Sequence, residues 1–98
     1  MKDTYRFEWD PAKALANERK HGISFDEAKT VFGDEYALHM YDGPHSWDEE
    51  RFIIIGRSER QRHLFVVYVD RSEVTLRLIS ARRATLRERR DYEEKAGS

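Results

Sequence analysis

The sequence predicts a single α+β domain, residues 1–98, in which a short N-terminal strand and two helices pack on an antiparallel sheet and a last helix follows. Two observations lead to this fold class. Helix start and stop signals crowd the first third of the chain, whereas three strand-like apolar runs joined by short polar segments follow position 50. In addition, 98 residues with 39% hydrophobic side chains suffice for one modest core.

The chain opens with a strand and a helix. Aromatic residues at positions 5, 7 and 9 alternate with charged ones, which is the period of a short, half-buried strand. Asp10 suits an N-cap and Pro11 the first helical position, so we expect a helix over Pro11–His21. Gly22 then provides the left-handed stop. The side of this helix that we expect to be apolar carries Ala12, Leu15 and Ala16, with Arg19 beside them.

A second helix start follows at once. Ser24 and Glu27 have the spacing of a capping box. The short helix that they begin has an apolar side made of Phe25, Ala28, Val31 and Phe32.

Strands dominate the chain after Gly33. Residues 36–42 form a weak candidate, and 51–56, 64–69 and 74–79 form three clear ones. The connections over 57–62 and 70–73 are short and polar, which indicates antiparallel hairpins or a meander. Residues 42–48 read as a loop, whose Trp47 is a candidate contact for a base or a protein partner.

Alternation along the last strand divides its side chains between two faces of the sheet. Leu76 and Leu78 point to one face and Arg77 to the other. We expect the first two helices on the leucine face. The Arg77 face is then partly open, with the basic C-terminal segment at its margin.

The most basic part of the chain lies at the start of the last helix, expected from Leu86 to about Lys95. Five arginines fall within the nine residues 82–90, and Thr85 and Glu88 have the spacing of a capping box. Cations at a helix N-terminus repel its positive pole unless an anion is present, and phosphate is the usual one. A solvated arginine-rich helix face is the alternative. Because Leu86 and Tyr92 are its chief apolar residues, this helix is expected to dock lightly.

Charge is distributed unevenly along the chain. Residues 1–50 hold six Lys and Arg against twelve Asp and Glu, a balance of −6, whereas residues 51–98 hold twelve against seven, a balance of +5. This asymmetry predicts a basic working face in the second half. The sequence has no cysteine, no apolar run of membrane-spanning length and no signal-peptide layout at its start, so we expect a cytoplasmic protein without membrane contact.

Two groups of residues resemble the BrnT family of toxins and span nearly the whole chain in the family's order. They are Phe7-Glu8-Trp9-Asp10-Pro11, Lys13, Asn17, Lys20-His21-Gly22-Ile23-Ser24-Phe25, Glu27-Ala28 and Val31-Phe32, and then Glu50-Arg51, Ile55-Gly56, 77–85, Glu88-Arg89 and Tyr92. The resemblance implies a RelE-like fold and the toxin of a type II toxin–antitoxin pair, a ribonuclease that stops translation. It also implies neutralisation by a BrnA-type antitoxin, with operator DNA contacted only through that antitoxin.

RNA cleavage gives the polar residues a chemical role. A metal-independent ribonuclease must deprotonate a 2′-hydroxyl, stabilise a pentacovalent phosphorane and protonate the leaving oxygen. We expect Arg77 and Arg82, and then Arg51, to supply the positive charge. Because a guanidinium stays protonated, proton transfer is assigned to His21. Further RNA contacts are expected from Lys20, Arg83, Arg87 and Tyr92.

Some of these residues have structural alternatives. His21 also suits a helix C-terminus, where the dipole favours it, and Glu88 could act as a base or only as a cap. Tyr92 could stack on a base or pack on the sheet. No metal or other cofactor is expected, because the histidines lack ligand spacing and residues 48–50 read as a solvated acidic loop. A non-catalytic module that binds RNA or protein through the same arginines remains the second hypothesis.

Overall fold

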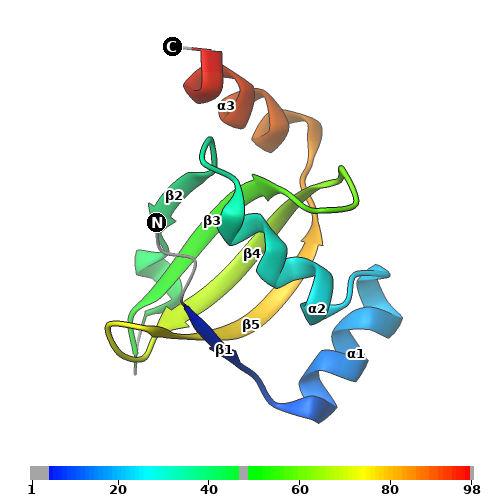
Figure 1. The fold of residues 1–98 in the computed structure, drawn as a ribbon, viewed down its shortest axis with the longest axis vertical. Coiled ribbons are helices and arrows are strands. Elements are labelled where there is room, and N and C mark those ends of the chain that lie inside the picture. Colours follow the sequence, from blue (N-terminus) through cyan, green and yellow to red (C-terminus); the bar gives the residue numbers. More distant parts are fainter. Residues whose placement is uncertain (1–4, 47–48, 98) are drawn as a thin grey trace.

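A five-stranded sheet of order β1-β5-β4-β3-β2 organises the molecule, and two helices cover one of its faces (Figure 1). The computed structural model describes residues 5–46 and 49–97. Its elements are β1 (Arg6–Glu8), α1 (Pro11–His21), α2 (Phe25–Ala28), the 3-10 helix η1 (Lys29–Gly33), β2 (Leu38–Tyr41), the 3-10 helix η2 (Gly43–His45), β3 (Arg51–Arg57), β4 (His63–Asp70), β5 (Thr75–Arg83) and α3 (Leu86–Gly97). The predicted α+β class is confirmed.

The sheet differs from the prediction at one edge. Strands β2 to β5 form an antiparallel meander, but β1 pairs with β5 in parallel, so the sheet is mixed. The long connection through the helices and the meander allows this direction, since a parallel pair needs a crossover. Because β1 spans three residues, it pairs only with Thr75–Arg77. It pairs with none of the residues from Leu78 onward.

Helix α1 has the predicted ends but a different buried side. The Asp10 carboxylate accepts a hydrogen bond from the Ala12 N–H at 2.9 Å, and Gly22 ends the helix with φ 73°. The buried residue of α1 is Asn17, whereas Leu15 is 53% exposed. The expected apolar side of Ala12, Leu15 and Ala16 therefore faces solvent. The Asn17 amide hydrogen-bonds to Ile23 and Ala81 and so holds this side of the helix toward β5.

The second helix start is also only partly as predicted. The Ser24 hydroxyl accepts from the Glu27 N–H at 3.0 Å, which is the first half of a capping box. The Glu27 carboxylate does not complete the box, because it accepts hydrogen bonds from Ser58 and Arg62 instead. After one α-helical turn the chain continues as η1.

The core lies between α1, α2 and η1 and the leucine face of the sheet. The predicted face of β5 is confirmed, since Leu76 and Leu78 are 4% and 2% exposed. Gly56 in β3 allows η1 to approach the sheet, because a Cβ there would lie 3.1 Å from the Val31 Cβ. The buried cluster comprises Ile23, Phe25, Ala28, Val31, Ala37, Ile54, Leu64, Val66, Tyr68, Leu76, Leu78 and Ala81.

Helix α3 lies at one end of the sheet, where it contacts β2 and β3 (Figure 1). Tyr92 is its buried residue, and the Tyr92 hydroxyl donates to Asp34 Oδ2 at 2.7 Å. The Lys95 ammonium donates to the Ala37 carbonyl at 3.2 Å. Few side chains thus dock this helix.

Candidate nucleic-acid interface on the open sheet face

The face of the sheet opposite α1 and α2 carries three arginines around an apolar centre. Cross-strand pairing places Arg51, Val69 and Arg77 in one row across β3, β4 and β5. A second row places Arg82 beside Phe65. Between these two rows lies a hollow of about 360 Å³, lined by Asp42, Arg51, Ile53, Phe65, Val67, Ser80 and Arg82.

A β-bulge in β5 brings Arg77 and Arg82 to the same face. These residues are five positions apart, so a regular strand would point them to opposite faces. The register shifts between Val67 and Tyr68, which pair with Ser80 and Leu78, and Ile79 is the extra residue. After the bulge, Ala81 points into the core and Arg82 to the open face. β5 also runs to Arg83, four residues beyond its predicted end.

Arg82 is paired with an anion from its own chain. Its guanidinium donates to both Glu88 carboxylate oxygens, at 2.9 and 3.0 Å, and lies 4.0 Å from the centroid of the Phe65 ring. Burial alone would raise the pKa of Glu88, but hydrogen bonds from Arg82 and from the Thr85 backbone outweigh it and hold that pKa below its usual value. The anion at the positive end of α3 is therefore Glu88.

Glu88 also completes the predicted capping box. It accepts from the Thr85 N–H at 2.8 Å, and the Thr85 hydroxyl accepts from the Glu88 N–H at 3.2 Å. One carboxylate thus caps α3 and holds Arg82.

The other two arginines of the face differ in how they are paired. Arg77 donates to Glu8 Oε2 at 3.3 Å, and about a third of its side chain is exposed. Arg51 lines the hollow, and its buried Nε has no hydrogen-bond partner among the described residues. A buried N–H without a partner costs free energy, so an oxygen atom that reached this group would be stabilised by it.

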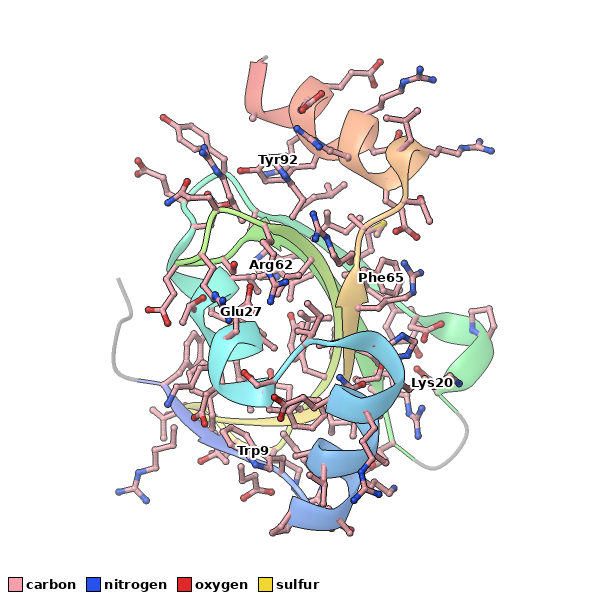
Figure 2. The ribbon with its side chains drawn as sticks, turned by 90° about the vertical axis from the view of Figure 1, so that its right-hand side faces the viewer. Trp9, Lys20, Glu27, Arg62, Phe65 and Tyr92 are labelled. Atoms are coloured by element: carbon pink, nitrogen blue, oxygen red, sulfur yellow. The ribbon has the colours of Figure 1, made fainter. Side chains whose placement is uncertain are left out.

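Lys20 and His21 lie at the end of α1 beside the margin of this face. Figure 2 shows Lys20 on the side of the sheet where Phe65 lies, away from Glu27 and Arg62. Lys20 is exposed, and His21 is half-buried. His21 follows Asn17 by four residues, so the two share one side of α1, which Asn17 turns toward β5. His21 is not among the residues that line the hollow.

The remaining predicted contacts fall into two classes. Arg83 and Arg87 are exposed and lie on either side of the α3 N-terminus. Tyr92 is only 6% exposed, with its ring 5.0 Å from the His63 ring, so the structure favours its packing role over stacking on a base. Trp47 lies outside the described residues.

Sequence reasoning missed three residues of the site. Asp42 lines the hollow from the segment after β2, and Phe65 supports the Arg82 guanidinium. Asn17 fixes the β5 edge next to Arg82. The sequence pattern predicts a turn at Asp42 and a strand at Phe65, and neither pattern indicates a functional site. Asn17 alone stood out, as a polar residue within the resemblance to BrnT.

Neither a metal cluster nor a membrane-spanning helix is found among the described residues. Residues 5–46 and 49–97 contain no group of three or more His, Asp or Glu side chains placed to hold a metal ion. No helix within these ranges combines the length and the apolar character needed to cross a bilayer.

Comparisons with known proteins agree with the fold and the motifs. Residues 9–88 match the family model described as the ribonuclease toxin BrnT of type II toxin–antitoxin systems. No curated protein matches the sequence. The fold is similar to the crystal structure of the Brucella abortus ribonuclease toxin BrnT, with a TM-score of 0.65 and 23% identity over 84% of this chain and 99% of that one. Since the family model spans most of the sequence, this chain belongs to the BrnT family of ribonuclease toxins of type II toxin–antitoxin systems.

Proposed function

We propose that this toxin is an endoribonuclease that binds RNA on the open sheet face and cleaves it through its own 2′-hydroxyl, without a metal ion. The support is the hollow between Arg51 and Arg82, with Arg77 at the same face. Guanidinium groups match phosphate oxygens in charge and geometry. The apolar floor of Phe65 and Val67 lowers the local dielectric, which strengthens their effect on a phosphate.

The proposed reaction balances within the RNA and the side chains of the face. A base takes the 2′-hydroxyl proton, the 2′-oxygen attacks the adjacent phosphorus, and the 5′-oxygen leaves with a proton to give a 2′,3′-cyclic phosphate. Arg51 and Arg82 stabilise the charge that builds up on the phosphorane, and Arg77 holds a neighbouring phosphate. Among the residues lining the hollow, Asp42 can accept the proton, and His21 at the margin remains the candidate donor.

Further contacts extend the RNA path beyond the hollow. Lys20 lies on the side of the sheet where Phe65 lies (Figure 2), and Arg83 and Arg87 are exposed near the α3 N-terminus. These cations bind successive phosphates and steer the strand. The bound RNA segment is therefore longer than the single nucleotide in the hollow.

The partner proposed for this toxin is a BrnA-type antitoxin. A type II toxin is neutralised by a protein, and the family of this chain implies one. We propose that the antitoxin also carries the operator-binding part, so that the toxin meets DNA only through it, and that both act in the cytoplasm.

The observation that carries the proposal is the position of Arg82, beside the hollow and above Phe65. Its test is growth arrest on induced expression together with cleavage of single-stranded RNA by purified toxin. Arg82→Ala should abolish both and keep the far-UV circular dichroism of the wild type. Arg60→Ala is the matched control, because this exposed arginine belongs to the loop between β3 and β4.

Two results would contradict the proposal. Cleavage by folded Arg82→Ala at the wild-type rate would remove this residue from the site. Wild-type protein that binds RNA without cleaving it and leaves growth unchanged would instead favour the non-catalytic module.

A further inference from the structure

One buried side chain takes the place of a strand at the edge of β5. The Asn17 amide nitrogen donates to the Ala81 carbonyl at 2.8 Å, and its oxygen accepts from the Ala81 N–H at 3.0 Å. The same nitrogen donates to the Ile23 carbonyl at 3.0 Å. β1 pairs with β5 only as far as Arg77. Asn17 therefore satisfies both backbone groups of Ala81 on the edge that β1 does not reach.

These bonds lie between the bulge and Arg82. The bulge at Ile79 leaves one unpaired residue in β5, and a shift of the chain by one position would turn Arg82 away from the open face. On one side Ala81 lies opposite Val66 in the β4 ladder. Its N–H and C=O both point to the other side, where they bond the Asn17 amide. The backbone hydrogen bonds of the residue before Arg82 are thus made by Asn17.

We propose that Asn17 is a positioning residue for the cleavage assigned above to the open face, acting through the backbone of Ala81 on the guanidinium of Arg82. This inference rests on the proposed function. The amide suits the role because it donates and accepts at once, and at 8% exposure it has few alternative partners in water. An aspartate would place an acceptor oxygen against the Ile23 and Ala81 carbonyls, which need a donor. A leucine would bond neither the N–H nor the carbonyl of Ala81.

The role separates turnover from binding. Lys20 and Arg77 hold the RNA from outside the segment that follows the bulge, so loss of the amide should leave KM within about threefold of wild type. A displaced Arg82 meets the transition state poorly, and kcat should fall about tenfold or more. Ala16→Gly is the control, because it weakens α1 at an exposed position without touching the Asn17 bonds. It should lower the melting temperature and leave kcat unchanged.

A double-mutant cycle with Asn17→Ser distinguishes positioning from general damage. If Asn17 acts through Arg82, adding Asn17→Ser to Arg82→Lys should cost less than about threefold in kcat, whereas adding it to Arg77→Lys should cost the full factor. Equal factors in the two backgrounds would overturn the proposal. The lysine variants are used because they retain charge and measurable turnover.

Hydrogen exchange provides a readout that does not depend on activity. The Ala81 amide should be protected in the wild-type protein as strongly as the core strands, and Asn17→Ser should lower that protection more than Ala16→Gly does. An Ala81 amide that exchanges rapidly in the wild type would overturn the proposal even where Asn17→Ser fails to fold. An inactive wild-type protein with a protected Ala81 would instead refute the proposed function, and with it the catalytic part of this inference.

Discussion

Replacing Arg62 with leucine should destabilise this protein strongly and leave its RNA chemistry intact. Arg62 lies in the loop between β3 and β4, and its Nε donates to Glu27 Oε2 at 2.9 Å while its Nη2 donates to Oε1. Glu27 is 3% exposed, and its other partner is the Ser58 hydroxyl at 2.7 Å. The hydrogen bonds from Arg62, reinforced by that hydroxyl, outweigh burial and lower the pKa of Glu27. Without Arg62, a buried carboxylate keeps a single neutral donor.

The size of the effect follows from the cost of an unpaired buried charge. Removing one partner of a buried pair costs about 3–5 kcal/mol, and because Arg62 is 24% exposed we expect a loss near 3 kcal/mol. For a domain of this size, that corresponds to a fall in melting temperature of about 12–24 °C. Thermal and urea unfolding followed by circular dichroism measure both quantities. RNA cleavage at low temperature should be unchanged, since Figure 2 shows Arg62 and Glu27 on the side of the sheet away from Phe65.

A second variant separates the charge from the packing. Arg62→Leu combined with Glu27→Met removes both charges, so the double variant should recover to within about 1 kcal/mol of the wild type. If Arg62→Leu alone loses less than about 1 kcal/mol, the pair does not stabilise the fold in the way described. A double variant as unstable as the single one would show that Arg62 contributes through packing.

Three further predictions concern the cap, the C-terminal helix and the pH response. Thr85→Ala should lower the free energy of unfolding by about 1 kcal/mol through loss of the cap, measured by urea unfolding, with cleavage retained because Glu88 still holds Arg82. Tyr92→Phe should cost about 1 kcal/mol by removing the bond to Asp34 while RNA affinity stays unchanged; a loss of affinity without a loss of stability would mean that the hydroxyl contacts RNA rather than Asp34. As the pH is lowered, stability should decrease in two stages, measured in a series of melting curves. Burial lowers the pKa of His63 from its ordinary 6.5, so the unfolded chain takes up the proton first below about pH 6.5. Because the pKa values of Glu27, Asp34 and Glu88 are also lowered in the fold, their contribution is present above about pH 4.5 and is lost as the pH falls further; a flat curve between pH 7 and 3 would contradict both stages.

Local patterns predicted the elements of the fold because each is encoded by neighbouring residues. Asp10 with Gly22 marked both ends of α1, and alternation along β5 placed Leu76 and Leu78 on the helix-covered face as observed. The parallel pairing of β1 left no such mark. A three-residue strand has the same alternation in either direction, and its partner lies about seventy residues away in the sequence.

The charged residues were harder to assign than the elements, because their partners are distant in the sequence. Glu27 had the spacing of a capping box, yet its carboxylate bonds to Ser58 and Arg62 across the fold. The outward turn of Leu15 similarly depends on Asn17 and Ala81, which are 64 positions apart. A periodicity argument assigns such residues from hydrophobicity alone, whereas a polar group that satisfies two backbone atoms can decide which side of a helix is buried.

The cluster of arginines around Arg82 combines a structural pair with a surface for an anion. Had all of these residues been free, the positive end of α3 would have needed an external anion; Glu88 supplies an internal one, at 2.9 Å from Arg82. A phosphate in the hollow must therefore compete with Glu88 for this guanidinium or share it. Glu88 thus sets how much of the charge of Arg82 the phosphate meets. Glu88→Gln, which keeps the acceptor for the Thr85 N–H and removes the competing charge, should tighten RNA binding at low salt; binding unchanged by this substitution would mean that Arg82 and the phosphate do not meet.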